Sequence, residues 1–463
     1  MTPTLKTRLL ALALAATPLL APAADARTLT PVYPSTYEAV PSGPVLVRGA
    51  TVLTGDGQRL ENADVLMRDG RIAAVGRGLN AGDATIVDGS GKWVTPGLID
   101  VHSHLGVYPA PGVNAHNDGN EMTNAVTAHV WAEHGVWPQD PGFGAALAGG
   151  ITTMMVLPGS ANLIGGRGVV LKNVPATTVQ AMKFPDAPHG LKMACGENPK
   201  RVYGSRGQAP MTRMGNIAGY RAAFIEAQKY REAWDRYNEA QEGRRGKSGN
   251  GEPPQHDLRL ETLAGALRGD ITVHIHCYRA DEMAQMMDLA KEFGFRIAAF
   301  HHGVEAYKLA DTLAERGICG ALWADWWGFK MEALDGIQEN LALVDRPANS
   351  CAIVHSDSPE GIQRLNQEAA KVMARGEAVG LKLPPEHVIR WLTSNAARAL
   401  GIADQVGTLE PGKMADVVLW NGNPFSVYAK AEKVWIDGAL LYDRDDPARQ
   451  PVSDFMLGQE VSP

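Results

Sequence analysis

Residues 97–104 read Gly-Leu-Ile-Asp-Val-His-Ser-His, a short apolar run that ends in two histidines separated by one residue. Side chains alternate between the two faces of a β-strand, so a strand here places His102 and His104 on the same side. Two imidazoles in that arrangement can bind one divalent metal, and zinc, iron and nickel all accept imidazole ligands. The pair lies at the C-terminal end of the run, where parallel barrels carry their active sites. The stretch therefore predicts a barrel strand with a metal-binding pair at its end.

Seven more apolar runs have the length and composition of buried strands, and helical stretches separate them. Near-continuous apolar strands that alternate with helices are typical of a parallel sheet covered on both faces. Together with residues 98–102 they give eight strands, which predicts a (β/α)8 barrel over residues 96–403. The seven runs are 151–157, 168–171, 191–195, 271–276, 296–300, 318–323 and 351–355.

Two segments far apart in the chain resemble halves of one small β domain. Residues 40–95 contain short β-rich runs separated by turns at Gly55-Asp56-Gly57 and Asp69-Gly70. Residues 404–450 contain further runs of the same kind, and neither segment has helical periodicity. We therefore expect both ends of the chain to build one β domain beside the barrel.

The first 26 residues have the pattern of a secretory signal peptide. Lys6 and Arg8 precede an apolar run over 9–20, and small residues that suit signal cleavage follow. No later run has the length and apolar character of a transmembrane helix. We expect an exported protein, periplasmic in a bacterium, with no membrane span after cleavage.

Charge and cysteine content exclude some functions. Residues 1–23 hold two of the 44 basic residues and none of the 51 acidic ones, so their removal leaves a net charge of −9. That balance disfavours nucleic acid as a partner. The four cysteines lack Cys-x-x-Cys spacing and lie in or beside apolar runs, which favours buried free thiols over disulfides.

Four motifs follow one another along the chain: residues 94–104 (Val-Thr-Pro-Gly-Leu-Ile-Asp-Val-His-Ser-His), 149–153 (Gly-Gly-Ile-Thr-Thr), 393–401 (Thr-Ser-Asn-Ala-Ala-Arg-Ala-Leu-Gly) and 407–416 (Gly-Thr-Leu-Glu-Pro-Gly-Lys-Met-Ala-Asp). With these motifs the chain resembles the amidohydrolase superfamily, close to its imidazolonepropionase-like and exported peptidase-like members. The resemblance covers essentially the whole chain after the signal. It implies a distorted (β/α)8 barrel, a β-sandwich made by both chain ends, and one or two divalent metal ions, with zinc the first candidate.

The resemblance also implies a set of metal ligands. His102 and His104 match the pair on the first barrel strand. On the fifth strand His276 is favoured over His274, because it ends the strand. On the sixth strand His302 matches the ligand, with His301 as its neighbour, and Asp357 matches the ligand after the eighth strand.

The fourth strand offers two groups that could bridge a pair of metal ions. Lys192 matches the carboxylated lysine of the exported peptidase-like members, whereas Glu197 could bridge without carbon dioxide. A single-metal site that uses neither residue is the third alternative.

These groups imply hydrolysis of a carbon–nitrogen bond in a small molecule. A bound metal lowers the pKa of its water and polarises a carbonyl group. Asp357 would act as the general base, and His302 would orient or donate to the substrate. An amide or cyclic amide is the expected substrate. The alternatives are a metallopeptidase of dipeptidase or carboxypeptidase type, and a non-catalytic scaffold.

Several polar and aromatic side chains lie after expected strands and are candidate substrate contacts. Asn162 and Arg167 follow the second strand, and Arg167 could hold a carboxylate, although Asn162 could equally organise a turn. Arg201 and Tyr203 follow the fourth strand, and Trp326 lies in a tryptophan-rich stretch after the seventh. Barrels of this size often associate, so a homo-oligomer is a further expectation.

Overall fold

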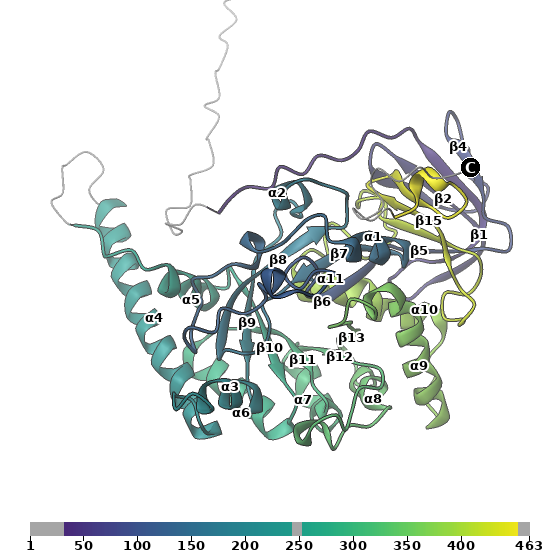
Figure 1. Cartoon of the computed structure of the whole chain (residues 1–463). Coiled ribbons are helices and arrows are strands. Elements are labelled where there is room, and N and C mark those ends of the chain that lie inside the picture. The colour runs from purple at the N-terminus through teal and green to yellow at the C-terminus, as the bar shows by residue number, and fades with distance from the viewer. Residues whose placement is uncertain (1–31, 243–251, 452–463) are drawn as a thin grey trace, which may run out of the picture.

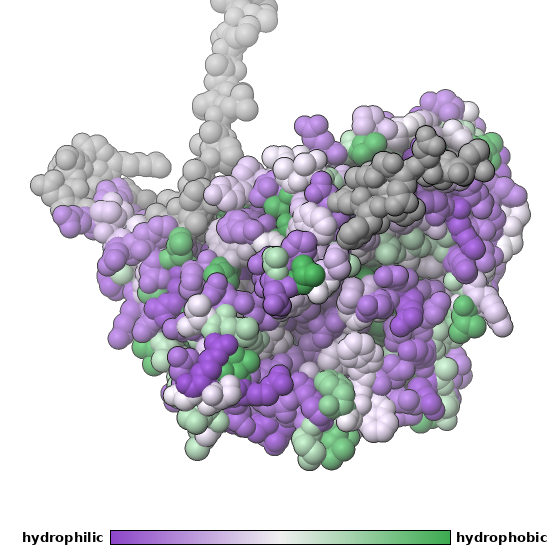
Figure 2. Space-filling view, in the orientation of Figure 1, coloured by the Kyte–Doolittle hydropathy of each residue, from purple (hydrophilic) through white to green (hydrophobic). Residues whose placement is uncertain are grey.

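The computed structural model describes residues 32–242 and 252–451 (Figure 1). The expected signal peptide over 1–26 lies outside these residues. Within the described part, no helix is both long enough and apolar enough to cross a membrane. The face of the molecule seen in Figure 2 is predominantly hydrophilic, with hydrophobic residues in small separate patches.

Eight strands form a nearly closed barrel sheet in which spatial order follows sequence order. The barrel strands are β6 (Leu98–Ser103), β7 (Ile151–Val156), β8 (Ile164–Lys172), β9 (Gly190–Ala194), β10 (Thr272–Cys277), β11 (Ile297–His302), β12 (Cys319–Leu322) and β13 (Ala352–Val354). All eight correspond to the runs expected from the sequence. Their side chains are almost entirely buried, as expected for a sheet covered on both faces.

The third strand of the barrel departs from the expected parallel arrangement. β8 runs antiparallel to both β7 and β9, whereas the other neighbouring pairs are parallel. Only residues 157–163 connect β7 to β8, and a parallel crossover needs a dozen or more residues. The strand expected at 168–171 is shorter than β8, and the longer link that it implies conceals the hairpin.

Eleven α-helices are present in the described residues, and most of them follow barrel strands (Figure 1). Their bounds are α1 (Pro141–Ala148), α2 (Val179–Met182), α3 (Glu197–Gly204), α4 (Arg213–Glu242), α5 (Leu258–Arg268), α6 (Ala280–Phe293), α7 (Ala310–Glu315), α8 (Asn340–Asp345), α9 (Leu365–Ala378), α10 (Pro385–Val388) and α11 (Ser394–Leu400).

A separate sheet combines the two ends of the chain (Figure 1). Its strands are β1 (Val45–Leu53), β2 (Arg59–Arg68), β3 (Arg71–Gly76), β4 (Thr85–Asp88), β5 (Trp93–Pro96), β14 (Val417–Trp420), β15 (Ala431–Ile436) and β16 (Ala439–Asp443). The two ends meet where β14 pairs antiparallel with β5, with Val418 opposite Thr95. Because β5 leads directly into β6, this pairing fixes the start of the first barrel strand.

A buried cation joins the sheet to the barrel. Lys172, at the end of β8, lies with its Nζ 3.1 Å from Asp416 Oδ1 and 2.9 Å from Asp437 Oδ2. The lysine is fully buried and both carboxylates are nearly so. Tyr37 donates a further hydrogen bond to Asp437. One positive charge from the barrel therefore lies between two carboxylates from the C-terminal segment.

The barrel closes between β6 and the residues after β13, which form no strand ladder with each other. Asp100 on β6 accepts hydrogen bonds from the backbone N–H groups of His102 and Ser356, at 3.1 and 3.3 Å, and from the Ser356 hydroxyl. The Asp357 N–H donates to the His102 carbonyl at 3.0 Å. Burial raises the pKa of Asp100 to about 7. We call these contacts the closing seam.

The expectation of free thiols is wrong. Cys195 is bonded to Cys277, and Cys319 is bonded to Cys351, with Cα–Cα distances of 5.2 and 4.5 Å. The partners lie 82 and 32 residues apart in sequence, but neighbouring strands bring them together: Cys195 directly follows β9 and Cys277 ends β10, whereas Cys319 begins β12 and Cys351 directly precedes β13. The cysteines of each pair are close because their strands are neighbours in the sheet. The spacing of the cysteines in the sequence does not show which strands are neighbours.

Replacing Lys172 with Met should destabilise the protein by about 3–5 kcal/mol, because it leaves two buried carboxylates without their cation. Adding Asp416→Asn and Asp437→Asn to that variant should restore much of the loss. Urea denaturation followed by circular dichroism measures both. A single Lys172→Met variant as stable as the wild type would contradict this account of the contact between sheet and barrel.

Candidate metal centre

The C-terminal ends of several barrel strands direct histidines toward one point. His102 lies on β6 and His104 directly after it, His276 lies on β10, His302 ends β11, and His355 follows β13. All but His104 are buried, and His104 is partly so. His301 and His302 are adjacent, so a regular strand would point them to opposite faces. His302 has φ of +71°, which interrupts the strand and lets both rings reach the interior.

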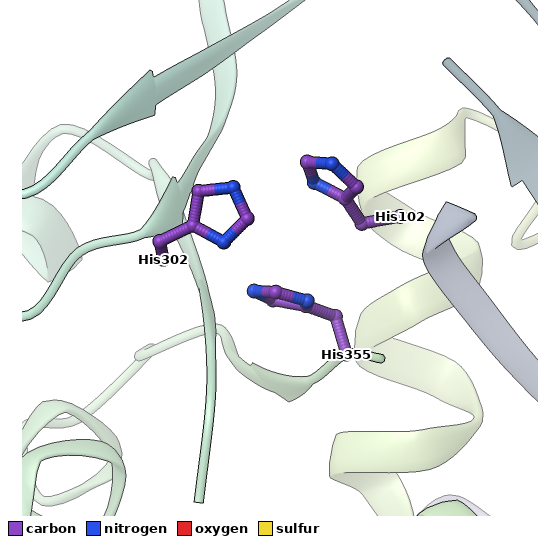
Figure 3. Close-up of side chains that lie close together, drawn as sticks. All are labelled: His102, His302 and His355. Carbon is purple, nitrogen blue, oxygen red and sulfur yellow. The ribbon is translucent and has the colours of Figure 1, made fainter. Parts of the chain in front are cut away.

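Two overlapping groups of residues have the spacing of metal ligands. His102, His302 and His355 each offer a ring nitrogen, and these atoms lie within 4.8 Å of one another (Figure 3). His102, His104 and Asp357 form a second group with the same property. His102 belongs to both, so the site has room for one ion or for two ions that share this region.

Unpartnered ring nitrogens show that the cluster fits a metal. His302 Nδ1, His276 Nδ1 and both nitrogens of His355 are buried and have no hydrogen-bond partner. Unpaired buried polar atoms are costly, and a metal would satisfy them. Burial lowers the pKa of His355 to about 3 and lowers the pKa of His302 well below its usual value. The rings are therefore neutral, which is the form that binds metal.

His104 and Asp357 are held in orientations suited to a metal. The Nδ1 atom of His104 lies 2.8 Å from the Leu157 carbonyl oxygen, which can only accept, so Nδ1 carries the proton and Nε2 keeps its lone pair. That Nε2 atom lies 3.1 Å from Asp357 Oδ1. Burial alone would raise the pKa of Asp357, but the electrostatic influence of His104, His355 and Lys192 outweighs it and lowers that pKa. Asp357 is therefore ionised at neutral pH.

Lys192 is the fourth-strand candidate that reaches the histidines. Its Nζ lies 3.2 Å from His102 Nε2, and its side chain is fully buried. Burial lowers the pKa of this amine to about 8. An appreciable fraction of Lys192 is thus uncharged at neutral pH, which an ordinary lysine is not.

The structure directs Glu197 elsewhere. Glu197 begins α3, and its Oε1 lies 3.4 Å from Lys330 Nζ. Lys330 also donates to Asn198 Oδ1 at 3.0 Å, which turns the Asn198 amide N–H toward His276 Nε2 at 3.3 Å. His276 therefore presents its unpartnered Nδ1 atom, and it belongs to neither of the two ligand groups found among the described residues.

His355 is the residue that sequence reasoning missed. It lies two positions before Asp357, within the motif that identified the aspartate. Its position directly after an apolar strand was the available signal, since polar residues at the C-terminal ends of barrel strands gather at one mouth.

Three of the expected substrate contacts are bound within the scaffold. Asn162 is buried, its amide donates to the Glu121 carbonyl and the Thr127 hydroxyl, and its Oδ1 accepts from Tyr203. These contacts hold Asn162 against the loop after β6 and against α3, rather than within a turn of its own. Arg167 is also buried: its Nε donates to Thr262 Oγ1 on α5. Arg167 was expected in a loop at the mouth of the barrel, but it lies within β8, which runs antiparallel to its neighbours.

The two remaining candidates, Arg201 and Trp326, are exposed. Arg201 lies on α3, and Trp326 stacks on Trp323 with ring centroids 5.1 Å apart. Trp323 in turn stacks on His302 at 4.2 Å. The aromatic stack therefore runs from the histidine cluster to the surface. A separate cleft of about 610 Å³ is lined by charged residues that include Glu197, Lys200 and Glu332.

Comparison with known proteins identifies relatives along most of the chain. A family model described as the amidohydrolase family matches residues 352–441. The amidohydrolase tasK of Hapsidospora irregularis is 34% identical over 436 residues, which are 86% of this chain and 43% of that protein. The chain thus spans less than half the length of that relative.

Two further relatives are matched over most of their length. The crystal structure of an amidohydrolase from Thermotoga maritima MSB8 is 36% identical with a TM-score of 0.77, and the match covers 86% of this chain and all of that one. An imidazolonepropionase from Mesorhizobium japonicum is 25% identical over 385 residues, 78% of this chain and 87% of that protein. These matches confirm the resemblance inferred from the four motifs.

His355→Ala should lower the amount of metal that copurifies with the protein, because it removes a buried neutral ligand from one of the two groups. Plasma mass spectrometry of protein purified without chelators measures the ratio of metal to chain. The matched control is His129→Ala, since His129 is exposed. Equal metal content in the two variants would show that His355 is not a ligand.

Proposed function

The chain belongs to the amidohydrolase family of hydrolases, and we propose that it uses one or two divalent ions, zinc first among them, to hydrolyse an amide or cyclic amide. The observation that carries the proposal is the set of buried, unpartnered ring nitrogens on His302 and His355 beside His102 and the ionised Asp357. A bound divalent ion supplies a lowered water pKa and polarises a carbonyl oxygen.

Two overlapping sets of ligands would hold the metal. His102, His302 and His355 would form one set, and His104 with Asp357 would complete a second set around His102. Lys192 is the group that would join two ions, because only an uncharged amine combines with carbon dioxide and burial favours that form. Glu197, paired with Lys330, is the weaker candidate.

Asp357 would move the proton. Its carboxylate lies at the edge of the histidine cluster, with Oδ1 3.1 Å from His104 Nε2 and Oδ2 3.8 Å from His302 Nε2. It can accept a proton from the attacking water and return it to the departing nitrogen. His302, stacked on Trp323, would orient the substrate.

The substrate side of the site favours a general amide hydrolase over a peptidase. A carboxylate-binding arginine would favour the peptidase alternative, and the first candidate, Arg167, has its guanidinium buried against Thr262 and the ring of Trp131. Trp326 and Arg201 remain accessible near the mouth, and we assign substrate contact to them. The intact ligand set argues against a non-catalytic scaffold.

We also propose that the protein is exported. Two disulfides are expected in an oxidising compartment and are rare in a reducing cytosol. They support the signal peptide predicted over residues 1–26.

Asp357→Asn should lower kcat by about 10²- to 10⁴-fold on any substrate found among dipeptides, N-acyl amino acids and cyclic amides, because the amide cannot act as a general base. Asp325→Asn is the matched control, since Asp325 pairs with Lys371 rather than with the histidines. Turnover assays on the purified zinc-loaded variants measure the effect. Undiminished turnover in Asp357→Asn would reject the proposed mechanism.

A further inference from the structure

A chain of hydrogen-bonded side chains leads from His102 into the barrel. His102 Nδ1 lies 2.8 Å from His301 Nδ1, and His301 Nε2 lies 2.9 Å from His274 Nδ1. His274 Nε2 lies 3.0 Å from the Thr272 hydroxyl oxygen. The three rings are fully buried. His274 and His301 thus connect the metal-facing His102 to a threonine at the start of β10.

The threonine sets the direction of every proton in this chain. Thr272 Oγ1 lies 3.2 Å from the His189 carbonyl oxygen, which can only accept, so the hydroxyl proton points there. His274 must then donate from Nε2 to Thr272, which leaves its Nδ1 to accept from His301 Nε2. His301 Nδ1 in turn accepts from His102 Nδ1. The lone pair of His102 is therefore on Nε2.

The opposite direction would be incompatible with a metal. If Thr272 donated to His274, each ring would reverse, and the proton of His102 would lie on Nε2. That atom faces His104 Nε2 at 3.3 Å and Asp357 Oδ1 at 3.4 Å, inside the second ligand group. Two protonated nitrogens cannot face each other at 2.8 or 2.9 Å, so each contact between neighbouring rings holds one proton.

We propose that Thr272, acting through His274 and His301, is a positioning residue that fixes the tautomer of His102 with its lone pair toward the metal. This inference rests on the proposed function. Of the two histidines on β10, His274 would then hold His301 in place rather than bind the metal. His104 achieves the same result with a single carbonyl, that of Leu157.

Packing keeps the relay in place. Gly190 lies on β9 beside His274, and a Cβ atom there would lie 3.0 Å from His274 Cδ2 and 2.9 Å from Met155 Cε. The absence of a side chain at position 190 thus provides the space that the His274 ring occupies. The close-packed surroundings oppose a ring flip that would reverse the direction of donation.

The test compares Thr272→Val with Thr272→Ser in the zinc-loaded full chain. Valine has nearly the same shape but no hydroxyl, so the His274 proton loses its acceptor, whereas serine keeps it. We expect Thr272→Val to weaken zinc binding by about 10- to 100-fold, the range seen when the outer partner of a ligating histidine is lost. Thr272→Ser should bind zinc as the wild type does. Equilibrium competition with a chromophoric chelator measures both.

A matched control and a second measurement separate the relay from a general disturbance. Thr153→Val removes a buried barrel hydroxyl that has no hydrogen-bond partner, and it should leave zinc binding unchanged. Nitrogen-15 NMR of histidine-labelled, zinc-loaded protein should show the proton of His274 and of His301 on Nε2 in the wild type and a mixture of tautomers in Thr272→Val.

Equal zinc affinity in Thr272→Val and wild type would overturn the inference. So would equal losses in Thr272→Val and Thr153→Val, or wild-type rings protonated on Nδ1. A wild-type protein that binds no zinc would instead reject the proposed function, and it is distinguished by the absence of any metal to displace.

Discussion

The closing seam between β6 and the residues after β13 is the constraint on which the site depends. These two ends of the barrel sheet share no ladder, and the Asp100 carboxylate joins them by accepting from His102 and Ser356. The same seam positions His102 on one side and Asp357 on the other through the Asp357 N–H bond to the His102 carbonyl. Closing the barrel and assembling the candidate metal site are therefore one structural event.

Burial gives the centre its chemistry. Imidazoles removed from water lose their affinity for protons, so the histidines stay neutral and keep lone pairs for a metal. The pKa of Asp357 is lowered despite burial, because the electrostatic influence of His104, His355 and Lys192 outweighs the loss of water. Burial also lowers the pKa of the Lys192 amine, to about 8, so part of it is uncharged at neutral pH. One environment thus prepares neutral ligands, an ionised base and a reactive amine.

Much of this arrangement could be predicted from the sequence. The alternation of strand side chains identified His102 and His104, and the apolar runs located all eight barrel strands. The reversed β8, the two disulfides and the burial of Arg167 could not be predicted, because each depends on which strands are neighbours and on how a short hairpin directs them. His355 was overlooked beside Asp357 because motif comparison drew attention to the aspartate alone.

The most direct test is anomalous diffraction at the zinc edge from crystals of the zinc-loaded protein. The account predicts at least one peak about 2.0–2.1 Å from a ring nitrogen of His102, with ligands from His302 and His355 or from His104 and Asp357. A second peak bridged by a carboxylated Lys192 would establish the two-metal form. No peak at the histidines, or peaks confined to the charged cleft near Glu332, would contradict the assignment of this cluster as the metal centre.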